Sequence, residues 1–320
     1  MLPKDIQGDD EKNRRIRQLI IKESPGVMTP EADESYCYIA RRIGLGCARM
    51  GSMRGPDPLK ARALIDQAYE RGVRLFDTAN SYAQGDSESI LGNSLKNRHD
   101  VMIVTKLGKQ VPLKARLLKP VKNLVRGLVK RSAQTEDVVR RARGGLLPVS
   151  FDVPVLRRQL DLSRRRLRRD CLPMVMLHSP TAEVLHAGHA VDFIEKAQNE
   201  GALEHIGVSV DDLEAAEACL SDPRIQMIQA PLHHSDQEMR AWAARAGAQG
   251  RHVVAREVFR QAVRPNLKLR PETIEHLLNT ALDTPGIKTC LIGTTNPTHL
   301  DQLLQMAQVH GSSSNAIEVF

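Results

Sequence analysis

Short apolar runs recur along this chain of 320 residues, and longer amphipathic segments lie between them. Short apolar runs are typical of buried strands, and segments with apolar residues three or four positions apart are typical of helices. Strands that alternate with helices pair in parallel through right-handed crossovers. Eight such units predict an α/β protein whose strands close into a (β/α)8 TIM barrel.

The expected elements can be placed by number. Strands are expected at 43–47, 73–77, 101–106, 174–178, 205–209, 225–230, 252–256 and 290–293. Helices are expected at 58–71, 87–97, 155–168, 192–200, 212–220, 236–247, 271–282 and 297–308. The alternative, a doubly wound sheet, needs a G-x-G-x-x-G turn after its first strand. Gly44-Leu45-Gly46 continues as Cys-Ala-Arg, which favours the barrel.

The basic residues are concentrated in one insertion. We expect a polar N-terminal arm (1–38), a barrel domain (39–310) and a C-terminal tail (311–320), with an accessory insertion at 107–150 after the third strand. The whole chain has 46 Lys and Arg against 38 Asp and Glu, a charge of +8. The insertion holds eleven basic and two acidic residues, a charge of +9, so the remainder is −1. A near-neutral body is not typical of nucleic-acid binders.

The insertion also has the pattern of a basic amphipathic helix. Apolar residues recur at helical spacing and basic residues lie on another face: Leu113, Leu117, Val121, Leu124 and Leu128 against Lys114, Lys122, Arg126 and Lys130. Four interpretations stay open: a cap on the barrel rim, a docking site for an acidic partner or carrier, a membrane-surface contact, or a site for an anionic substrate. The arginines of 164–169 are interpreted as a solvated helix face.

The remaining composition favours a cytoplasmic protein. No stretch approaches the ~18 apolar residues of an integral membrane segment. The N-terminus is polar and lacks the apolar region of a secretory signal. Five scattered cysteines without C-x-x-C spacing are typical of reduced thiols.

Three consecutive strands end on ionisable residues. These are Asp77, Lys106 and His178, and Tyr82 follows Asp77 in the next loop. The carboxyl ends of barrel strands form one rim, where the active sites of this fold lie. Each residue alone has a commoner structural explanation, such as a helix cap, an ion pair or a surface aromatic. All four on adjacent units favour a common site.

These side chains suit proton transfer to an oxygen atom. Asp77 would keep a buried Lys106 charged. A nearby ammonium favours phenolate, so we expect a lowered pKa for Tyr82 and a better proton donor. His178 would orient a carbonyl oxygen. Such protonation accompanies hydride addition to C=O, and the hydride has to come from a cofactor.

The same residues resemble the aldo/keto reductase family. Residues 76–92, FDTANSYAQGDSESILG, are similar to its pattern F-D-T-A-x-x-Y-x-x-G-x-S-E-x-x-L-G. VTK at 104–106, LHSP at 177–180, IGVS at 206–209 and IGTTNPTHL at 292–300 resemble its later motifs. The resemblance implies a (β/α)8 barrel that reduces aldehydes and ketones with NADPH, less often NADH. It also implies Asp77, Tyr82, Lys106 and His178 as catalytic residues, with Tyr82 as general acid.

The resemblance places the cofactor along the same rim. Ser209 and Gln229 would lie near the nicotinamide carboxamide. The phosphate would lie at the start of the last helix, where the candidates are Gly293, Thr294, Asn296 and His299. Independently, an Asn N-cap followed by Pro starts a helix whose N-terminus attracts phosphate. Arg256, at the end of the seventh strand, would contact the pyrophosphate or form a structural salt bridge.

Some positions depart from the family pattern. Val210 stands where the family often has Asn, and Gln302 and Leu303 stand where it often has a Glu–Asn pair at the adenine. The alternative to a reductase is a cofactor-sensing regulatory or accessory protein that keeps the fold. A metal-dependent hydrolase is disfavoured, because His233 and His234 are adjacent and point to opposite sides of an extended chain. No metal site is expected.

Overall fold

The computed structural model describes residues 42–52, 55–111, 147–260 and 269–315. The expected N-terminal arm and the amphipathic helix of the insertion lie outside the described residues.

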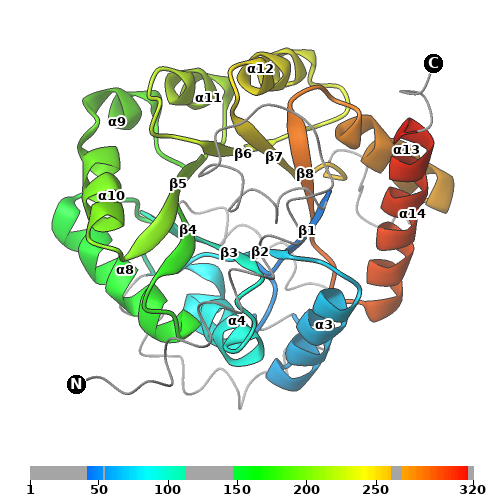
Figure 1. Ribbon diagram of the computed structural model, residues 1–320, viewed down its shortest axis with the longest axis horizontal. Helices are drawn as coiled ribbons and strands as arrows, with labels where there is room; N and C mark the ends of the chain where they lie inside the picture. The colour runs from blue at the N-terminus through cyan, green and yellow to red at the C-terminus, as the bar shows by residue number, and fades with distance from the viewer. Residues whose placement is uncertain (1–41, 53–54, 112–146, 261–268, 316–320) are drawn as a thin grey trace, which may run out of the picture.

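Eight parallel strands close into a barrel in chain order (Figure 1). Each strand pairs with its sequence neighbours, and β1 also pairs with β8, with Leu45 opposite Ile292. The strands are β1 (Ile43–Gly46), β2 (Leu75–Asp77), β3 (Met102–Leu107), β4 (Leu172–His178), β5 (Leu203–Ser209), β6 (Met227–Pro231), β7 (His252–Arg256) and β8 (Ile287–Ile292). The predicted (β/α)8 barrel is confirmed.

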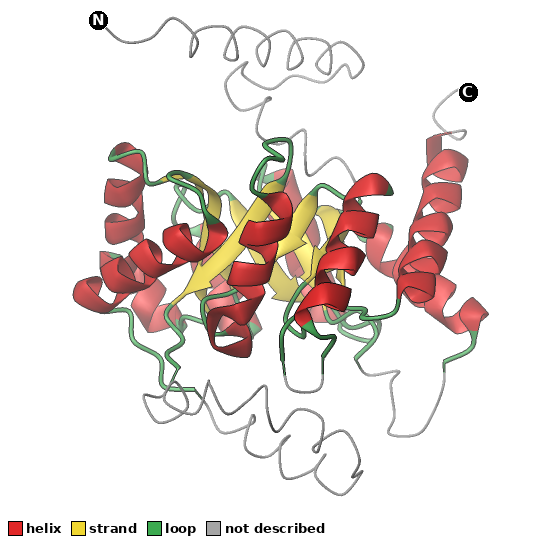
Figure 2. Ribbon diagram, turned by 90° about the horizontal axis from the view of Figure 1, so that it is seen from below, coloured by secondary structure: helices red, strands yellow, loops and turns green. Residues whose placement is uncertain are grey.

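Helices surround the strands on the outside, as the side view in Figure 2 shows. They are α3 (Pro58–Glu70), α4 (Asp86–Leu95), α8 (Val153–Leu167), α9 (Ala182–Ala187), α10 (His189–Asn199), α11 (Leu213–Leu220), α12 (Gln237–Ala248), α13 (Pro271–Leu282) and α14 (Pro297–Asn315), with a 3₁₀ turn η3 (Tyr82–Gly85). Aspartate caps start three of them: Asp57, Asp212 and Asp236 each accept a backbone N–H three residues ahead, which satisfies a donor of the first turn.

The apolar core has two layers. Inside the barrel, a small cluster is rich in methionine and aliphatic side chains: Leu75, Met102, Val104, Met174, Met176, Met227, Val254 and Leu291. A larger cluster fills the space between the strands and the helices. Because strand side chains alternate between these two layers, nearly every strand position is buried, as parallel sheets covered by helices require.

Several element bounds differ from those expected. Helix α9 was not expected, and Gly188 separates it from α10 with a positive φ of 76°. Strands β4, β5 and β8 begin two or three residues earlier than their apolar runs, and α14 continues to Asn315, beyond the expected barrel end at 310. Strand starts are polar or mixed here, so the apolar pattern alone cannot find them. No described helix is long and apolar enough to cross a membrane.

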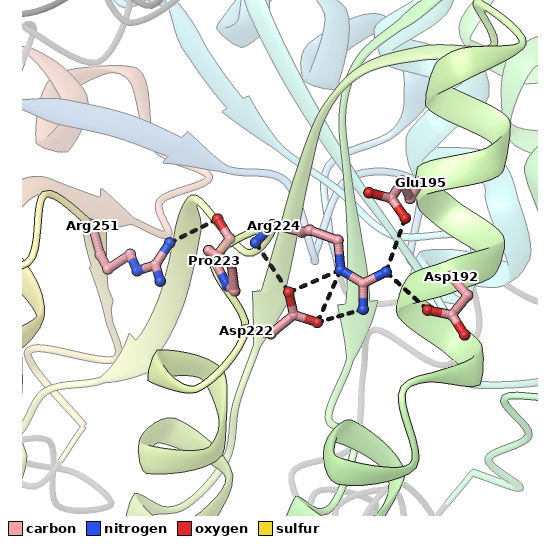
Figure 3. A network of polar contacts seen from close by, with 6 residues as sticks. All are labelled: Asp192, Glu195, Asp222, Pro223, Arg224 and Arg251. Carbon is pink, nitrogen blue, oxygen red and sulfur yellow. Dashed lines mark hydrogen bonds and ion pairs between the residues drawn. The ribbon is translucent and has the colours of Figure 1, made fainter.

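An arginine network joins the segments at the amino end of the barrel (Figure 3). Arg224, just before β6, donates to Asp222, to Asp192 at 2.8 Å and to Glu195 at 2.9 Å. Arg251, just before β7, donates to the Pro223 carbonyl at 2.9 Å. Since helix-to-strand connections lie at this end, the network supports the barrel opposite the rim that carries Asp77 and His178.

Candidate active site

A buried ion pair lies at the centre of the carboxyl rim. Lys106 of β3 is completely buried, and its Nζ pairs with Asp77 Oδ1 at the end of β2. The same ammonium donates to the Thr78 carbonyl at 2.9 Å. Burial lowers the pKa of Lys106, and Asp77 opposes this effect. Adjacent parallel strands bring the two residues together, as the strand-end pattern predicted.

Two further strands extend this polar network. Gln229 of β6 donates from Nε2 to Asp77 Oδ1 at 2.8 Å, and Ser209 of β5 donates to Gln229 Oε1 at 2.9 Å. Both side chains are almost fully buried. The hydrogen bonds satisfy groups that would otherwise be expensive to bury. Hence Gln229 is linked directly to the ion pair, and Ser209 is linked to it through Gln229; both residues are expected at a nicotinamide.

Tyr82 and His178 face each other above the pair. Their rings meet edge to face, with centroids 5.9 Å apart and planes at 86°. Lys106 Nζ lies 5.1 Å from the centroid of the tyrosine ring. The structure therefore brings the four predicted catalytic residues to one place.

The expectation of a lowered tyrosine pKa is wrong for this arrangement. Burial and the Asp77 carboxylate raise the pKa of Tyr82, and Arg256 opposes them only in part. The physical reason is that burial disfavours the charged phenolate and that the Asp77 carboxylate repels it. Tyr82 is thus a neutral phenol at physiological pH.

His178 is kept neutral by its surroundings. Burial, followed by Lys106, Lys109 and Arg256, lowers its pKa well below the usual value. Its Nδ1 has no hydrogen-bond partner among the described residues. In a neutral imidazole one ring nitrogen donates a hydrogen bond and the other accepts one. The His178 ring can therefore bind and orient a polar group of a ligand.

Arg256, at the end of β7, is engaged by the protein itself. Its guanidinium pairs with Asp211 and Glu257 and donates to the Val210 carbonyl at 2.6 Å. Lys109 also reaches Asp211, with 3.8 Å between Nζ and Oδ2. Of the two roles expected for Arg256, these contacts correspond to the structural salt bridge. The other role, contact with the pyrophosphate of a cofactor, stays a prediction.

The segment after β8 starts α14 with a side-chain cap. Asn296 Oδ1 accepts the Thr298 N–H at 3.0 Å, and Thr294 Oγ1 accepts the Asn296 N–H at 3.1 Å. Gly293 and His299 are exposed, and Thr294 is buried. A Cβ added at Gly293 would meet no described atom within 4 Å, so the chain leaves open space there.

A second polar layer behind Tyr82 was not anticipated. Glu88 of α4 is completely buried, and Arg166 of α8 donates to its Oε2 at 3.0 Å. Thr105 donates to Glu88 Oε1 at 2.7 Å. The interpretation of 164–169 as a solvated face is therefore wrong for Arg166, and also for Arg169, which donates to the Leu95 and Arg98 carbonyls. The S-E pair of the motif at 76–92 was the available signal, because it places a carboxylate on the apolar face of a helix.

Metal ligands are not clustered in the described part of the chain. Within it, no three or more His, Cys, Asp or Glu side chains are placed to hold a metal ion. The four described cysteines are free thiols.

Known proteins are similar in both sequence and fold. D-threo-aldose 1-dehydrogenase of a Pseudomonas species is 30% identical over 183 residues, covering 52% of this chain and 49% of that protein. The aldo-keto reductase YhdN of Bacillus subtilis is 24% identical over 205 residues, covering 62% and 52%. The chain spans about half the length of the curated relatives it matches.

Solved structures share the barrel. The holo form of an aldo-keto reductase from Bacillus halodurans superposes with a TM-score of 0.65 at 20% identity, covering 83% of this chain and 86% of that one. An aldo/keto reductase from Klebsiella pneumoniae, in complex with NADP and acetate, gives a TM-score of 0.59 at 20% identity, covering 83% and 85%. A model described as the aldo/keto reductase family matches residues 42–317. The chain belongs to the aldo/keto reductase family.

Proposed function

We propose that this protein reduces an aldehyde or ketone to an alcohol with NADPH, or catalyses the reverse oxidation. The observation that carries the proposal is the pair of facing rings, Tyr82 and His178, above the buried Lys106–Asp77 ion pair. Membership of the family supports it, and so does the NADP bound by the Klebsiella pneumoniae relative. NADH remains a second possible cofactor of this site, and we place the activity in the cytoplasm.

The residues on the rim fit such a cofactor. Ser209 and Gln229 present a buried hydroxyl and amide next to the ion pair, which suits recognition of a carboxamide. The open space at Gly293 and the capped start of α14 at Asn296 suit a phosphate, because a helix N-terminus carries partial positive charge. Thr294 and His299 flank this start. When bound, NADPH would supply the hydride.

The protein's own residues supply the proton and the positioning. The Tyr82 hydroxyl donates its proton to the carbonyl oxygen as that oxygen becomes negative. The raised pKa keeps Tyr82 protonated beforehand, and Lys106, 5.1 Å from the ring, stabilises the phenolate that remains. Neutral His178 holds the carbonyl oxygen by a hydrogen bond. Asp77 keeps the ammonium in place.

The insertion at 107–150 adds a second part to the proposal. Its charge of +9 suits an anionic substrate or an acidic partner or carrier, whereas the barrel itself is nearly neutral. Lys109, at the described end of the insertion, already lies close enough to lower the pKa of His178. The insertion thus begins beside the proposed site.

Tyr82→Phe tests the central assignment. Removing the proton donor should lower kcat by roughly 10²–10⁴-fold while NADPH binding stays unchanged. Tyr69→Phe is a matched control, because its hydroxyl bonds to Asp100 at the opposite end of the barrel. Turnover of an aldehyde panel and NADPH affinity are measured for both variants. Equal kcat in Tyr82→Phe and wild type would remove Tyr82 as the acid, and NADPH binding without any turnover would favour the cofactor-sensing alternative.

A further inference from the structure

Glu88 is a buried carboxylate that the proton-transfer steps do not use. Its side chain is completely shielded from water in α4. Burying a carboxylate is unfavourable unless it is paired and hydrogen-bonded. Both oxygens are engaged here, Oε1 by the Thr105 hydroxyl and Oε2 by Arg166. Each partner belongs to a different element of the site's wall.

The turn that carries Tyr82 has an unfavourable backbone. Ala83, Gln84 and Gly85 follow one another with φ values of 50°, 62° and 88°. The left-handed region is unfavourable for residues with a Cβ, and consecutive residues in it persist only where the surroundings hold them. Something outside the turn must therefore fix it.

Arg166 makes that contact. Its Nη1 donates to the carbonyl of Asn80, two residues before Tyr82, at 3.4 Å. The guanidinium also covers Gly85, three residues after Tyr82. A Cβ added at Gly85 would lie only 2.3 Å from Arg166 Cζ. One planar cation thus touches the chain on both sides of the tyrosine and pairs with Glu88.

Thr105 connects the same carboxylate to the other half of the site. It directly precedes Lys106 in β3, and its hydroxyl is the second partner of Glu88. The chain of contacts therefore runs from the Tyr82 turn through Arg166 and Glu88 to the strand that holds the ammonium. We propose that Arg166 and Glu88 are positioning residues that fix the Tyr82 hydroxyl relative to Lys106. This inference rests on the proposed reductase function.

The chain offers a matched control. Arg169 follows α8 by two residues and is, like Arg166, only partly exposed. It donates to the Leu95 carbonyl at 2.7 Å and the Arg98 carbonyl at 2.6 Å, so it also joins the α8 segment to α4. Its contacts lie at the other end of α4, away from residues 80–85. Arg166→Gln and Arg169→Gln remove the same charge from neighbouring positions.

The two variants should differ in kcat. Arg166→Gln should lower kcat by roughly 10–100-fold, since misplacing a catalytic group by about 1 Å can reduce the rate about 10²-fold. NADPH affinity should be unchanged in both variants, and Arg169→Gln should keep near wild-type kcat. Guanidinium added to Arg166→Ala should restore part of the lost kcat and should not affect Arg169→Ala. Equal kcat in Arg166→Gln and Arg169→Gln would overturn the proposal.

Amide hydrogen exchange gives a readout that does not depend on turnover. Arg166→Gln should speed exchange at residues 80–86, and Arg169→Gln should speed it at residues 95–99 instead. If Arg166→Gln does not fold, Arg166→Lys keeps a charge for Glu88 but lacks the planar guanidinium that covers Gly85, and the same exchange pattern is expected. Unchanged exchange at 80–86 in a folded Arg166 variant contradicts the positioning role. A wild-type protein without carbonyl turnover contradicts the proposed function instead.

Discussion

The ion pair between Asp77 and Lys106 is almost entirely shielded from water. Buried pairs of this kind add little net stability, because the desolvation of both charges offsets their attraction. Removing only one partner is different, since it leaves an uncompensated charge in the core. We therefore explain the pair by the proposed role of the Lys106 ammonium beside Tyr82, and not by a contribution to the stability of the barrel.

Single and double neutralisation of the pair should separate stability from turnover. Lys106→Met leaves Asp77 buried with Gln229 as its remaining partner, and should lower the free energy of unfolding by about 3–5 kcal/mol. Asp77→Asn combined with Lys106→Met should recover most of that stability and none of the turnover. Urea unfolding and kcat at saturating NADPH measure the two effects. A double variant as unstable as the single one would show that charge is not the cause.

Sequence reasoning predicted that Asp77, Tyr82, Lys106 and His178 lie together, but it misjudged the electrostatics around Tyr82. The four strand-end and loop residues could be found because parallel barrel strands bring their carboxyl ends to one rim. The sign of the Tyr82 pKa shift could not be found. It depends on how deeply the phenol is buried and on how close the Asp77 carboxylate lies to it, and neither follows from residue order. Arg166 was missed for a similar reason, because its partner Glu88 lies 78 positions earlier in the chain.

A histidine away from the site should make stability depend on pH. Burial, and then the charge of Lys288, lowers the pKa of His252 to about 4, against about 6.5 in the unfolded chain. The unfolded state then binds the proton more readily, so stability is complete above about pH 6.5 and falls as the pH drops toward about 4. His252→Asn should flatten this decline, and the exposed His234→Asn should not. The urea midpoint across this range is the measurement, and parallel curves for wild type and His252→Asn would contradict the assignment.

At the scale of elements, periodicity predicted most helices and the order of all strands. It failed where a local backbone feature overrides the pattern. Helix α9 was not expected, and Gly188 separates it from α10, which corresponds to the helix expected at 192–200. The turn at 83–85 forms η3 through left-handed residues that no hydrophobic pattern encodes. Close contacts between elements, such as Gly92 of α4 against the Arg166 carbonyl, depend on three-dimensional packing as well.

The arginine network of Figure 3 should stabilise the junction between α10 and β6 without affecting the reaction. Arg224→Gln leaves three carboxylates, Asp192, Glu195 and Asp222, without their shared cation. We expect a loss of about 1–2 kcal/mol in unfolding free energy, because charge-assisted networks exceed single surface pairs. Arg71→Gln, which breaks the exposed pair with Asp301, should cost less than about 1 kcal/mol. Both should keep wild-type kcat, and a loss of kcat in Arg224→Gln would contradict a purely structural role.

At the scale of the whole molecule, the excess positive charge lies in a different part of the sequence from the barrel strands and helices. The insertion holds the excess positive charge, and the barrel surrounding the site is nearly neutral. The described ends of the insertion meet at one neck, where Lys109 and Val149 form an antiparallel bridge and Gln110 donates to the Pro148 carbonyl at 2.7 Å. The described residues that flank 112–146 on either side therefore meet at a single place.

From this arrangement we predict that the insertion favours the binding of anionic substrates and does not change the rate of the chemical step. Attraction between exposed charges is screened within about 10 Å at about 0.1 M salt. Turnover of an anionic carbonyl compound should therefore fall as salt is added, whereas turnover of a small neutral aldehyde should hardly change. Replacing Lys122, Arg126, Lys130 and Arg131 with Gln should reproduce the effect of salt on the anionic substrate only. Steady-state kcat/KM for both substrates measures this.

Two controls make the outcome decisive. Replacing residues 112–146 with a short glycine-serine linker should leave a folded barrel, because the neck at Lys109 and Val149 already brings the ends together. That variant should reduce the neutral aldehyde at the wild-type rate and should show no salt dependence for the anionic one. If it unfolds, the insertion contributes to the barrel core. If salt and the quadruple change alter both substrates equally, or neither, the positive charge of the insertion does not select the substrate, since attraction to an anion must distinguish a charged compound from a neutral one.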